Sequence, residues 1–313
     1  MIVHGNKKIS EMVYARLAKE GGGAVRLTNM IRGPQVVFGD LYPFSPWLTA
    51  TTCKAILGAF GVSDGTAVIK ATNQYLNVLA ASDRDKATAL AALINEDPMM
   101  VCSLGLEPQG VTMPIRIVTN AGGAYVNLGY KVTSNNFRAE LGFDKNAGST
   151  DPFGFCKRNG DTEWFTSYGS ECSCYIGTSG ALFSLGYGTA GVKRDIIIET
   201  TSTGKVRYGV NTTTLTEKNF NGSLTTDPGK FCLFTMDNDA AMTKNRVSNG
   251  TTYWYAKLYQ DGNCVREAYP FIRNGVNGFI DVIGGGFYPN ANNVGTLTIA
   301  YTRNGQPWTP STP

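Results

Sequence analysis

Two carboxylates on one strand face are the feature of this sequence closest to catalytic chemistry. Asp195 and Glu199 are four residues apart, and because side chains alternate along a β-strand, both would lie on one face. Glycoside hydrolases use such a pair as nucleophile and acid/base. The intervening residues 196–198, all isoleucine, however predict a core strand with the acids at its solvated ends. The other acids on predicted strands do not repeat this spacing; they are Glu140, Glu163 and Glu267. The sequence therefore argues against catalysis.

The histidine and glycine content removes other catalytic mechanisms. His4 is the sole histidine and lies near the N-terminus. The body of the chain therefore cannot form a Ser-His-Asp triad, an HExxH zinc site or a two-histidine metal site. The glycine-rich segments 21–23 and 284–286 lack the Lys-Ser/Thr pair that a phosphate-binding loop requires. These residue types favour a binding or structural protein over an enzyme.

The seven cysteines do not follow a recognisable metal or disulfide pattern. Their number is odd, and the paired CxxC spacing of a zinc site is absent. Only Cys172 and Cys174 are close together, and on a strand they would share one face. A disulfide or half of a metal site is one interpretation of this pair. Free thiols packed as small apolar side chains are the favoured interpretation.

Two oxygen-rich segments could hold a hard cation. Asp237, Asn238 and Asp239 form one, and residues 159–161 form the other. Calcium sites use carboxylate and carbonyl oxygens of this kind. The same residues are common in turns, and Asp237 is not followed by the Gly and distal Glu of an EF-hand. We therefore expect no cofactor, with a structural Ca²⁺ at residues 237–239 as the alternative.

Five aromatic residues on predicted strands are candidates for contact with a sugar or a protein. They are Trp164, Tyr168, Tyr253, Tyr255 and Tyr259. Exposed aromatic rings can stack on sugar rings, and tyrosine is enriched in protein interfaces. The competing interpretation is cross-strand packing, which stabilises a sheet by up to about 1 kcal/mol per pair. For any single one of these residues, packing is the favoured interpretation.

The overall composition indicates a folded, weakly charged chain. Of the 313 residues, 42% are hydrophobic and 17% are charged, which allows a sizeable core. The 37 glycines favour an all-β protein with many turns. The net charge of +4 is not concentrated in a basic run, so we expect no nucleic-acid partner. No apolar stretch is long enough to span a membrane, and the N-terminus lacks the apolar region of a signal peptide, which predicts folding in a cytoplasm.

Residues 1–112 are expected to form a smaller, mixed α/β or helical domain that anchors or docks the protein. Short strand-like pieces come first and are interrupted by glycines and prolines. Apolar residues spaced along one face then predict three helices, at about residues 49–60, 65–80 and 84–96. In the second of these, the apolar stripe consists of Val68, Tyr75, Leu76 and Leu79.

Between residues 113 and 303 the pattern changes to short alternating segments separated by Gly, Asn, Asp and Ser. Many such segments with almost no helix signal predict an antiparallel β-sandwich. The clearest hairpin joins residues 252–260 and 263–271 through Asp261-Gly262, a dipeptide that favours a tight type I′ turn. The remaining residues, 304–313, form a Pro-rich tail that we expect to be loose or to serve as a contact arm.

Strict alternation in the first arm of this hairpin assigns its side chains to two faces. The side chains expected to face the core are Trp254, Ala256 and Leu258. Those expected on the outer face are Tyr253, Tyr255, Lys257 and Tyr259. The three tyrosines would then form one exposed row, suited either to a sugar or to a protein partner.

Several short motifs lie between residues 125 and 296. They are the segments 125–129, 136–141, 261–262, 265–266, 278–282, 287–290 and 295–296, together with Pro270. These motifs resemble the opening and closing strands of concanavalin-A-like (LamG-like) domains in bacteriophage and prophage structural proteins. The resemblance brackets residues 115–303 and is most specific in residues 253–297. It implies a mostly β fold, with a concanavalin-A-like antiparallel sandwich (jelly roll) over residues 113–303.

The function that this resemblance implies is that of a virion structural protein: a capsid decoration, a head fibre or a tail-associated protein. The N-terminal segment would dock on the particle and the sandwich would be displayed. Partners would be other virion proteins of the capsid or tail, further copies in a homo-oligomer and, secondarily, surface glycans, but neither nucleic acid nor membrane. The protein would be made in the host bacterial cytoplasm and located in the virion. The alternatives are a carbohydrate-binding adhesin for host-surface or mucus glycans and, less favoured, a glycoside hydrolase.

Overall fold

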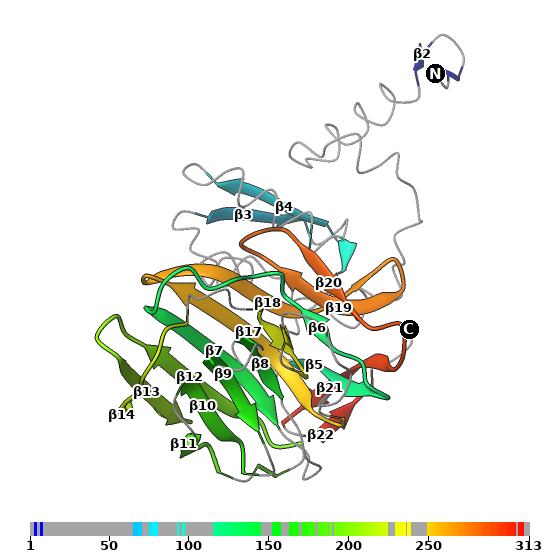
Figure 1. Ribbon diagram of the computed structural model, residues 1–313. Helices are drawn as coiled ribbons and strands as arrows, with labels where there is room; N and C mark the ends of the chain where they lie inside the picture. The colour runs from blue at the N-terminus through cyan, green and yellow to red at the C-terminus, as the bar shows by residue number, and fades with distance from the viewer. Residues whose placement is uncertain are drawn as a thin grey trace. The chain divides into compact units, whose positions relative to one another are not determined.

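In the computed structural model, the chain divides into two compact units, Met1–Ala91 together with Pro310–Pro313, and Ala92–Thr309. The structure describes residues 3–4, 7–8, 65–70, 75–80, 93, 96–97, 115–144, 152–157, 163–168, 171–178, 181–186, 188–189, 191–224, 229–235, 237–238, 249–304 and 306–309. Among these residues the secondary structure is almost entirely β-strand (Figure 1).

Two antiparallel hairpins are described in the first unit. β1 (Val3–His4) pairs with β2 (Lys7–Lys8), and β3 (Gly65–Lys70) pairs with β4 (Tyr75–Ala80). The helix predicted over residues 65–80 is therefore wrong. Its apolar stripe joined residues of two separate strands, and the β-branched residues in these strands favour extended backbone over helix.

The other two predicted helices are described in part or not at all. The helix predicted at residues 49–60 lies outside the described residues. At the end of the segment 84–96, Leu93 and Glu96 are helical. The amide N–H of Asp97 donates to the Leu93 carbonyl oxygen at 2.9 Å, the i to i−4 bond of an α-helix. The chain is therefore helical where it enters the second unit.

The second unit contains two sheets, of which the smaller has seven strands. Its order is β11-β10-β9-β8-β15-β6, with β16 added to β8. The strands are β6 (Val126–Asn127), β8 (Phe153–Lys157), β9 (Glu163–Tyr168), β10 (Ser173–Gly177), β11 (Ala181–Ser184), β15 (Cys232–Leu233) and β16 (Asp237–Asn238). The described pairings are antiparallel, apart from the parallel pair β16–β8.

The larger sheet has eleven strands, all paired antiparallel among the described residues. Its order is β14-β13-β12-β7-β17-β18-β19-β20, and β5, β21 and β22 branch from it. The strands are β5 (Ile115–Ala121), β7 (Phe137–Asp144), β12 (Arg194–Thr200), β13 (Lys205–Val210), β14 (Thr216–Asn219), β17 (Thr252–Gln260), β18 (Asn263–Arg273), β19 (Val276–Asp281), β20 (Phe287–Pro289), β21 (Thr296–Arg303) and β22 (Gln306–Trp308).

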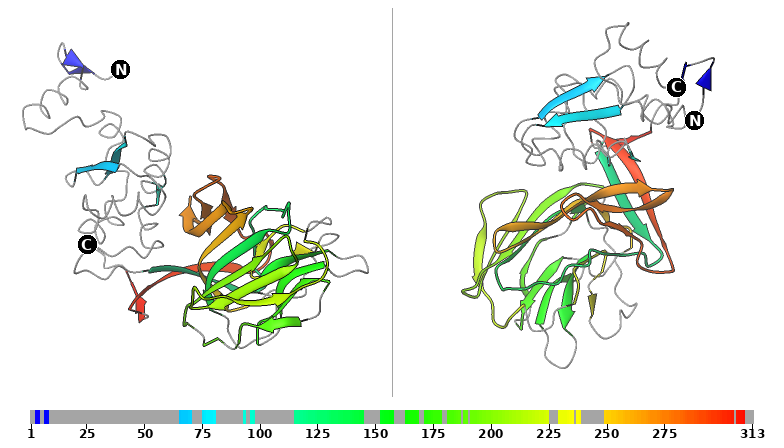
Figure 2. Two further views of the ribbon diagram at one scale, coloured as in Figure 1. Left: turned by 90° about the vertical axis from the view of Figure 1, so that its left-hand side faces the viewer. Right: turned by 90° about the horizontal axis from the view of Figure 1, so that it is seen from above.

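The two sheets form separate layers around an aromatic core (Figure 2). The ring centroid of Phe137 in β7 lies 5.1 Å from that of Phe165 in β9 and 6.1 Å from that of Phe155 in β8. A second contact between the sheets joins Phe143 and Phe153 at 5.7 Å. All five side chains are buried. The predicted antiparallel β-sandwich is thus confirmed at the level of its layers and pairing.

Strand β12 shows how the sequence pattern produces this arrangement. Ile196 and Ile198 are buried in the core, whereas Asp195, Ile197 and Glu199 are partly exposed. The three consecutive isoleucines therefore do not make a strand buried on both faces, because alternation turns the middle one outward. Both acids consequently lie along the outer face of the sheet rather than only at the ends of a core strand.

The Asp261-Gly262 hairpin has the predicted position and turn. Gln260 pairs with Asn263, and the two turn residues have φ values of 51° and 80°. Positive φ at both central positions is the signature of a type I′ turn, which fits the twist of the flanking strands. Asp261 tolerates this conformation and Gly262 adopts it without strain.

A β-bulge within β17 overturns part of the predicted face assignment. Against β7, Tyr253 pairs with Phe143 but Tyr255 pairs with Gly142, so Trp254 is the inserted residue. The extra residue turns Tyr253 inward. Tyr253 is fully buried, and its ring centroid lies 5.4 Å from that of Phe143. The exposed row of three tyrosines predicted for this strand is therefore wrong at Tyr253.

The large sheet divides at β17. One edge of β17 pairs with β7, whereas the other pairs with β5 at Thr252 and Tyr253 and with β18 over residues 256–260. β5 continues to β21 and β18 continues to β19, so two arms leave β17. We call the division between β5 and β18 the fork. The Asn277 side-chain amide in β19 donates to the Leu297 carbonyl oxygen in β21 at 2.8 Å and links the two arms.

The tail at residues 304–313, predicted to be loose or a contact arm, is in part a strand, β22. β22 pairs with β21, with Arg303 opposite Gln306 and Tyr301 opposite Trp308. Asn304, in the turn between the two strands, has a φ of 52°, a left-handed conformation that asparagine adopts more readily than most residues. The proline-rich composition argued against a strand here. Pro307 is nevertheless compatible with β22, because proline is tolerated in an edge strand.

Candidate functional site: the outer face of the large sheet

The outer side of the eleven-stranded sheet carries a group of charged residues and tyrosines that contact one another. We call this surface the ionic face and define it by Arg138, Glu140, Lys193, Asp195, Glu199, Lys205, Arg207, Glu217, Tyr255, Lys257, Tyr259, Glu267 and Tyr269. Five of these residues are acids and five are bases, so the formal charges balance. In β7, β12 and β17, strand alternation places these residues on the outer face because their neighbours in sequence fill the core.

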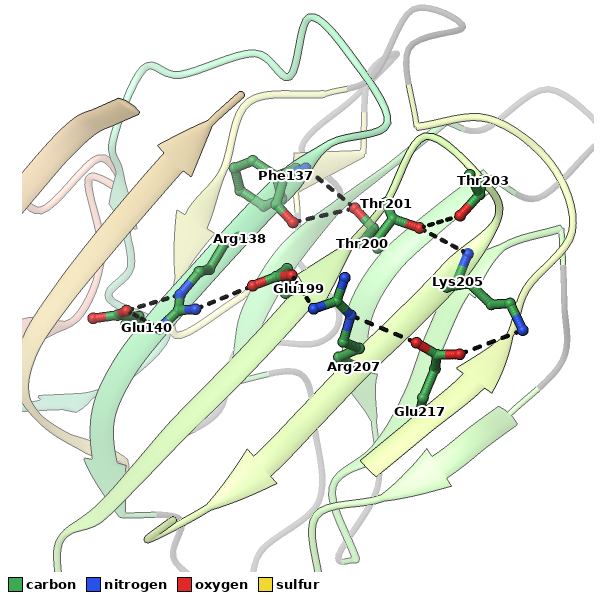
Figure 3. A network of polar contacts seen from close by, with 10 residues as sticks. All are labelled: Phe137, Arg138, Glu140, Glu199, Thr200, Thr201, Thr203, Lys205, Arg207 and Glu217. Atoms are coloured by element: carbon green, nitrogen blue, oxygen red, sulfur yellow. Dashed lines mark hydrogen bonds and ion pairs between the residues drawn. The ribbon is translucent and has the colours of Figure 1, made fainter. Parts of the chain in front are cut away.

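A ladder of ion pairs crosses four strands of this face (Figure 3). Arg138 in β7 donates from Nε to Glu140 at 2.8 Å and from Nη1 to Glu199 at 3.1 Å. Arg207 in β13 lies 3.3 Å from Glu199 and 3.6 Å from Glu217, nitrogen to oxygen. The strand register supports these pairs, since Glu199 is directly opposite both arginines.

Solvent exposure divides the ladder into a strong and a weak half. The side chains of Arg207 and Glu217 are 44% and 48% exposed, so water screens their attraction. Glu199 is only 19% exposed and Arg138 is 33% exposed. Burial opposes the charge of Arg138, but hydrogen bonds and attraction from Glu140 and Glu199 outweigh it and raise the pKa of Arg138. The inner half is therefore a firmly held charge cluster.

Three tyrosine hydroxyls on this face donate to carboxylates. The pairs are Tyr255 with Asp195 at 2.9 Å, Tyr259 with Glu140 at 3.3 Å, and Tyr269 with Glu267 at 2.7 Å. Burial, followed by the neighbouring carboxylate charge, raises the pKa of all three phenols above the ordinary value of 10.0. The hydroxyls therefore stay protonated and act as hydrogen-bond donors.

Each of these carboxylates also binds a cation. The pairs are Asp195 with Lys193 at 2.8 Å, Glu140 with Arg138 at 2.8 Å, and Glu267 with Lys257 at 2.8 Å. The same cations lie near the tyrosine rings. Lys193 Nζ is 5.2 Å from the Tyr255 centroid, and the Arg138 guanidinium is 5.7 Å from that of Tyr259. The face thus repeats one unit three times: a tyrosine, a carboxylate and a cation.

Gly142 allows Tyr255 to lie against the backbone of β7. A Cβ at position 142 would come within 2.5 Å of Tyr255 Cε1 and 3.2 Å of Lys193 Cε. With a glycine below it and cations within 6 Å, the Tyr255 ring has little free face for stacking on a sugar. The predicted sugar-stacking role is therefore less well supported at Tyr255 than cross-strand packing.

The acid pair suggested by the sequence is present, and both of its carboxylates form ion pairs. Asp195 and Glu199 share the outer face of β12, as their spacing predicted. Asp195 is held by Lys193 and Tyr255, and Glu199 by both Arg138 and Arg207. A glycosidase needs one carboxylic acid that can donate a proton and a second carboxylate facing the scissile bond. Both groups are engaged in ion pairs in this structure.

Sequence spacing alone could not reveal that Glu140 and Glu267 join this face. Glu140 comes from β7 and Glu267 from β18, two strands separated by most of the domain in sequence but placed on either side of β17 by the strand order. The register places Lys257 opposite both acids. Only alternation within each strand was visible beforehand, and it correctly turns Glu140 away from the core.

The remaining aromatic candidates belong to the other sheet. Trp164 and Tyr168 lie in β9, which pairs with β8 and β10. Their side chains fall outside the described part of the structure. The structure therefore does not bring these two residues together with Tyr255 and Tyr259, which lie on the eleven-stranded sheet.

The oxygen-rich segment at residues 237–239 is partly a strand. Asp237 and Asn238 form β16, and their backbone pairs in parallel with Phe155 and Cys156. Asp239 lies outside the described residues, as does the second segment at 159–161. Among the residues that the structure describes, no three His, Cys, Asp or Glu side chains are grouped as a metal site. A calcium ion at this position stays a prediction without a geometric basis.

Four cysteines of the second unit, Cys172, Cys174, Cys232 and Cys264, are not joined in disulfides. Cys172, Cys174 and Cys232 are buried, and Cys264 is partly exposed. Burial, followed by the charge of Glu267, raises the pKa of Cys264 to about 11, which keeps this thiol protonated near neutral pH. Packed thiols are thus confirmed for Cys172 and Cys174, in place of a disulfide.

The fold and this face define the protein as an antiparallel β-sandwich whose large sheet presents an ion-paired outer surface. No model of a protein family matches the chain, and a comparison with curated proteins finds no match either. Within the described part of the chain, no helix has the length and apolar character needed to cross a membrane.

Proposed function

We propose that this protein is a structural component of a bacteriophage particle: a capsid decoration, a head fibre or a tail-associated protein. Residues 1–112 would dock on the particle, and the sandwich, of the concanavalin-A-like type, would be displayed. The motifs between residues 125 and 296 support this proposal, since they resemble such domains in phage structural proteins. The two-layer antiparallel architecture is compatible with them.

The observation that best supports a structural rather than a catalytic role is that the carboxylates of the ionic face are paired with bases and tyrosines. The carboxylates of Glu140, Asp195, Glu199 and Glu267 each contact a base, and three of the four also accept a tyrosine hydroxyl. Such mutual pairing stabilises the sheet and fixes its surface. It offers a partner a polar face with balanced charges instead of a reactive group.

Glycan binding is the second candidate function. The partly exposed Tyr255 and Tyr259, surrounded by carboxylates, have the composition of a sugar site. The cations near their rings reduce the area available for stacking. A glycan would therefore be a secondary partner of a protein whose main contacts are with neighbouring virion proteins.

The experiment that tests the proposal is the protein composition of purified particles. Particles released from cells that carry this gene would be banded by density, washed in high salt and analysed by quantitative mass spectrometry. We expect the chain in a fixed ratio to a capsid or tail protein. A chain found only in the particle-free lysate would overturn the proposal.

Binding of the full-length chain to a glycan array separates the second candidate from the first. The structural role predicts no binding that depends on the ionic face. Binding that is lost in Tyr255→Ala and kept in Lys205→Ala would favour the adhesin. Hydrolysis of a β-glucan that disappears in Glu199→Gln would contradict the non-catalytic assignment.

A further inference from the structure

Arg116 in β5 is a fully buried cation that forms an ion pair with Asp97, a residue that precedes the strands of the sandwich. Its exposed fraction is 0%, and Nη2 donates to Asp97 Oδ1 at 2.8 Å while Nη1 binds the other carboxylate oxygen. A charge removed from water is tolerated only when it is paired and hydrogen-bonded. Asp97, itself 6% exposed, is therefore a required part of the sandwich interior.

Asp97 belongs to the segment through which the chain enters this unit. The unit begins at Ala92, and Leu93 and Glu96 are helical. Asp97 Oδ2 also accepts the backbone N–H of Ile272 in β18 at 2.8 Å. One carboxylate thus bonds to both sides of the fork, to β5 through Arg116 and to β18 through Ile272.

A neighbouring ion pair strengthens this attachment. Arg273, the last residue of β18, donates to the two carboxylate oxygens of Glu96 at 2.7 Å and 3.2 Å. Two consecutive acids at the end of the helical segment therefore hold β18, and one of them also holds β5. The incoming segment is fixed by side chains on both arms of the sheet.

Arg116 also contacts the strands through which the chain leaves the unit. Tyr301 in β21 is opposite Arg116 in the register, and Arg116 Nη2 lies 3.4 Å from the Tyr301 hydroxyl. The guanidinium carbon is 5.6 Å from the Tyr301 ring centroid. Tyr301 in turn pairs with Trp308 of β22, with ring centroids 6.0 Å apart, and the unit ends at Thr309.

We propose that Arg116 couples the segment that enters the sandwich unit, at Asp97, to the β21–β22 hairpin through which the chain leaves it. Asp97 bound in the fork orients the guanidinium, and the oriented guanidinium holds Tyr301 and through it the β21–β22 hairpin. Withdrawal of Asp97 would remove a charged partner of Arg116 and release the Ile272 N–H, and we expect it to loosen β22. This inference rests on the fold and does not depend on the proposed function.

The test is hydrogen–deuterium exchange of the full-length protein and its variants, read amide by amide. In Asp97→Asn, which keeps an oxygen acceptor but removes the charge, we expect exchange at Ile272 and across residues 301–308 to rise by about tenfold or more. Exchange in β12 and β13 should match that of the parent. The matched control is Lys193→Met, which breaks an ion pair whose partners are 37% and 49% exposed and should leave β21 and β22 unchanged.

A reciprocal variant keeps the proposal falsifiable if Asp97→Asn does not fold. Tyr301→Phe removes the hydroxyl contact at the outgoing end and should raise exchange at Ile272, at the incoming end. Unchanged exchange in β22 of Asp97→Asn, or at Ile272 of Tyr301→Phe, would overturn the proposed coupling through Arg116. A uniform rise across β12, β13 and β22 would also overturn it, since that result indicates general destabilisation without specific coupling.

Discussion

At the scale of single residues, the ionic face depends on a position with no side chain. Gly142 faces outward in the middle of β7, where a Cβ would overlap the Tyr255 ring. The ring occupies the space above this glycine, and its hydroxyl reaches Asp195 in the adjacent strand β12. An aromatic side chain covering a strand glycine compensates for the packing that the glycine itself cannot supply.

Gly142→Ala is therefore expected to destabilise the protein by roughly 1–3 kcal/mol, because the new methyl group displaces Tyr255 and breaks its bond to Asp195. Urea denaturation of the full-length chain measures this change. In a Tyr255→Ala background the same substitution should cost much less, since no ring then occupies the space. An equal cost in both backgrounds would show that the effect is unrelated to Tyr255.

Asp144 gives a prediction for pH dependence. This carboxyl is 2% exposed, and burial raises its pKa above the ordinary value of 3.8, despite backbone hydrogen bonds from Gly191 and Thr252 that oppose the shift. A raised pKa in the folded state means that folding favours the protonated carboxyl. The associated stability is fully present below the unfolded pKa and is lost as pH rises through the folded pKa.

The pH prediction is tested by comparing the parent with Asp144→Asn from acidic pH towards neutrality. The free energy of unfolding of the parent, relative to the variant, should fall as pH rises through this window. The asparagine cannot titrate, so it removes the contribution of residue 144 alone. A difference that stays constant with pH, or that grows in favour of the parent, would contradict the assignment.

At the scale of elements, strand order decides which charges meet. Arg138 and Arg207 both bind Glu199, but from opposite sides of β12, and they differ in exposure. The inner arginine carries hydrogen bonds to two acids in a partly buried setting, whereas the outer one lies in a solvated pair. The two arginine–Glu199 ion pairs are therefore expected to contribute unequally to the free energy of unfolding, although both are arginine–carboxylate pairs.

Arg138→Met is expected to cost about 1–3 kcal/mol, because it leaves Glu140 and Glu199 without their shared donor. Arg207→Met, the matched control, is expected to cost less than about 1 kcal/mol. Chemical denaturation at low and high salt measures both changes. The Arg207 effect should shrink with salt more than the Arg138 effect. Equal costs with equal salt dependence would show that the ladder is not divided by burial.

Turn residues and the alternation of side chains made the strands of the sandwich predictable from the sequence. The pairing between distant strands was not predictable in this way. Asp261-Gly262 and the alternation of β12 and β17 are properties of neighbouring residues, and they indicated the hairpin and most inward-facing positions. The bulge at Trp254 could not be foreseen, because it arises where β17 changes partner from β5 to β18. That change turned Tyr253 into the core.

The same limit explains the error at residues 65–80. Apolar spacing over a window of this length fits one helix face or two short strands, and only the pairing of β3 with β4 distinguishes them. Only some residues of the ionic face could likewise be predicted from the sequence. The sequence showed Asp195, Glu199, Tyr255 and Tyr259, but not that Arg138, Glu140 and Glu267 would be brought beside them by the strand order.

At the scale of the whole chain, the compact sandwich unit starts at Ala92, earlier than the start predicted at residue 113. The buried ion pair of Asp97 and Arg116 crosses that predicted boundary. Composition cannot reveal such a contact, because a single carboxylate carries it. A fragment cut at the predicted boundary, residues 113–303, would omit Asp97 and its ion pair with Arg116.

The proposed role in a particle is also a property of the whole molecule. A sandwich with a charge-balanced, internally paired face, and with Asp97 and Tyr301 both bound to Arg116, is suited to display and packing. The central claim is that this unit is held on a virion by the chain that precedes it. Composition of purified particles tests presence, whereas imaging tests position and attachment together.

The most direct measurement is electron cryomicroscopy of intact particles at a resolution that traces the chain. The account predicts density for residues 92–309 on the particle surface, with the preceding segment in contact with a capsid or tail protein. It also predicts that the ionic face is either exposed or packed against a protein neighbour. Particles whose traced density contains no copy of this sandwich would contradict the account.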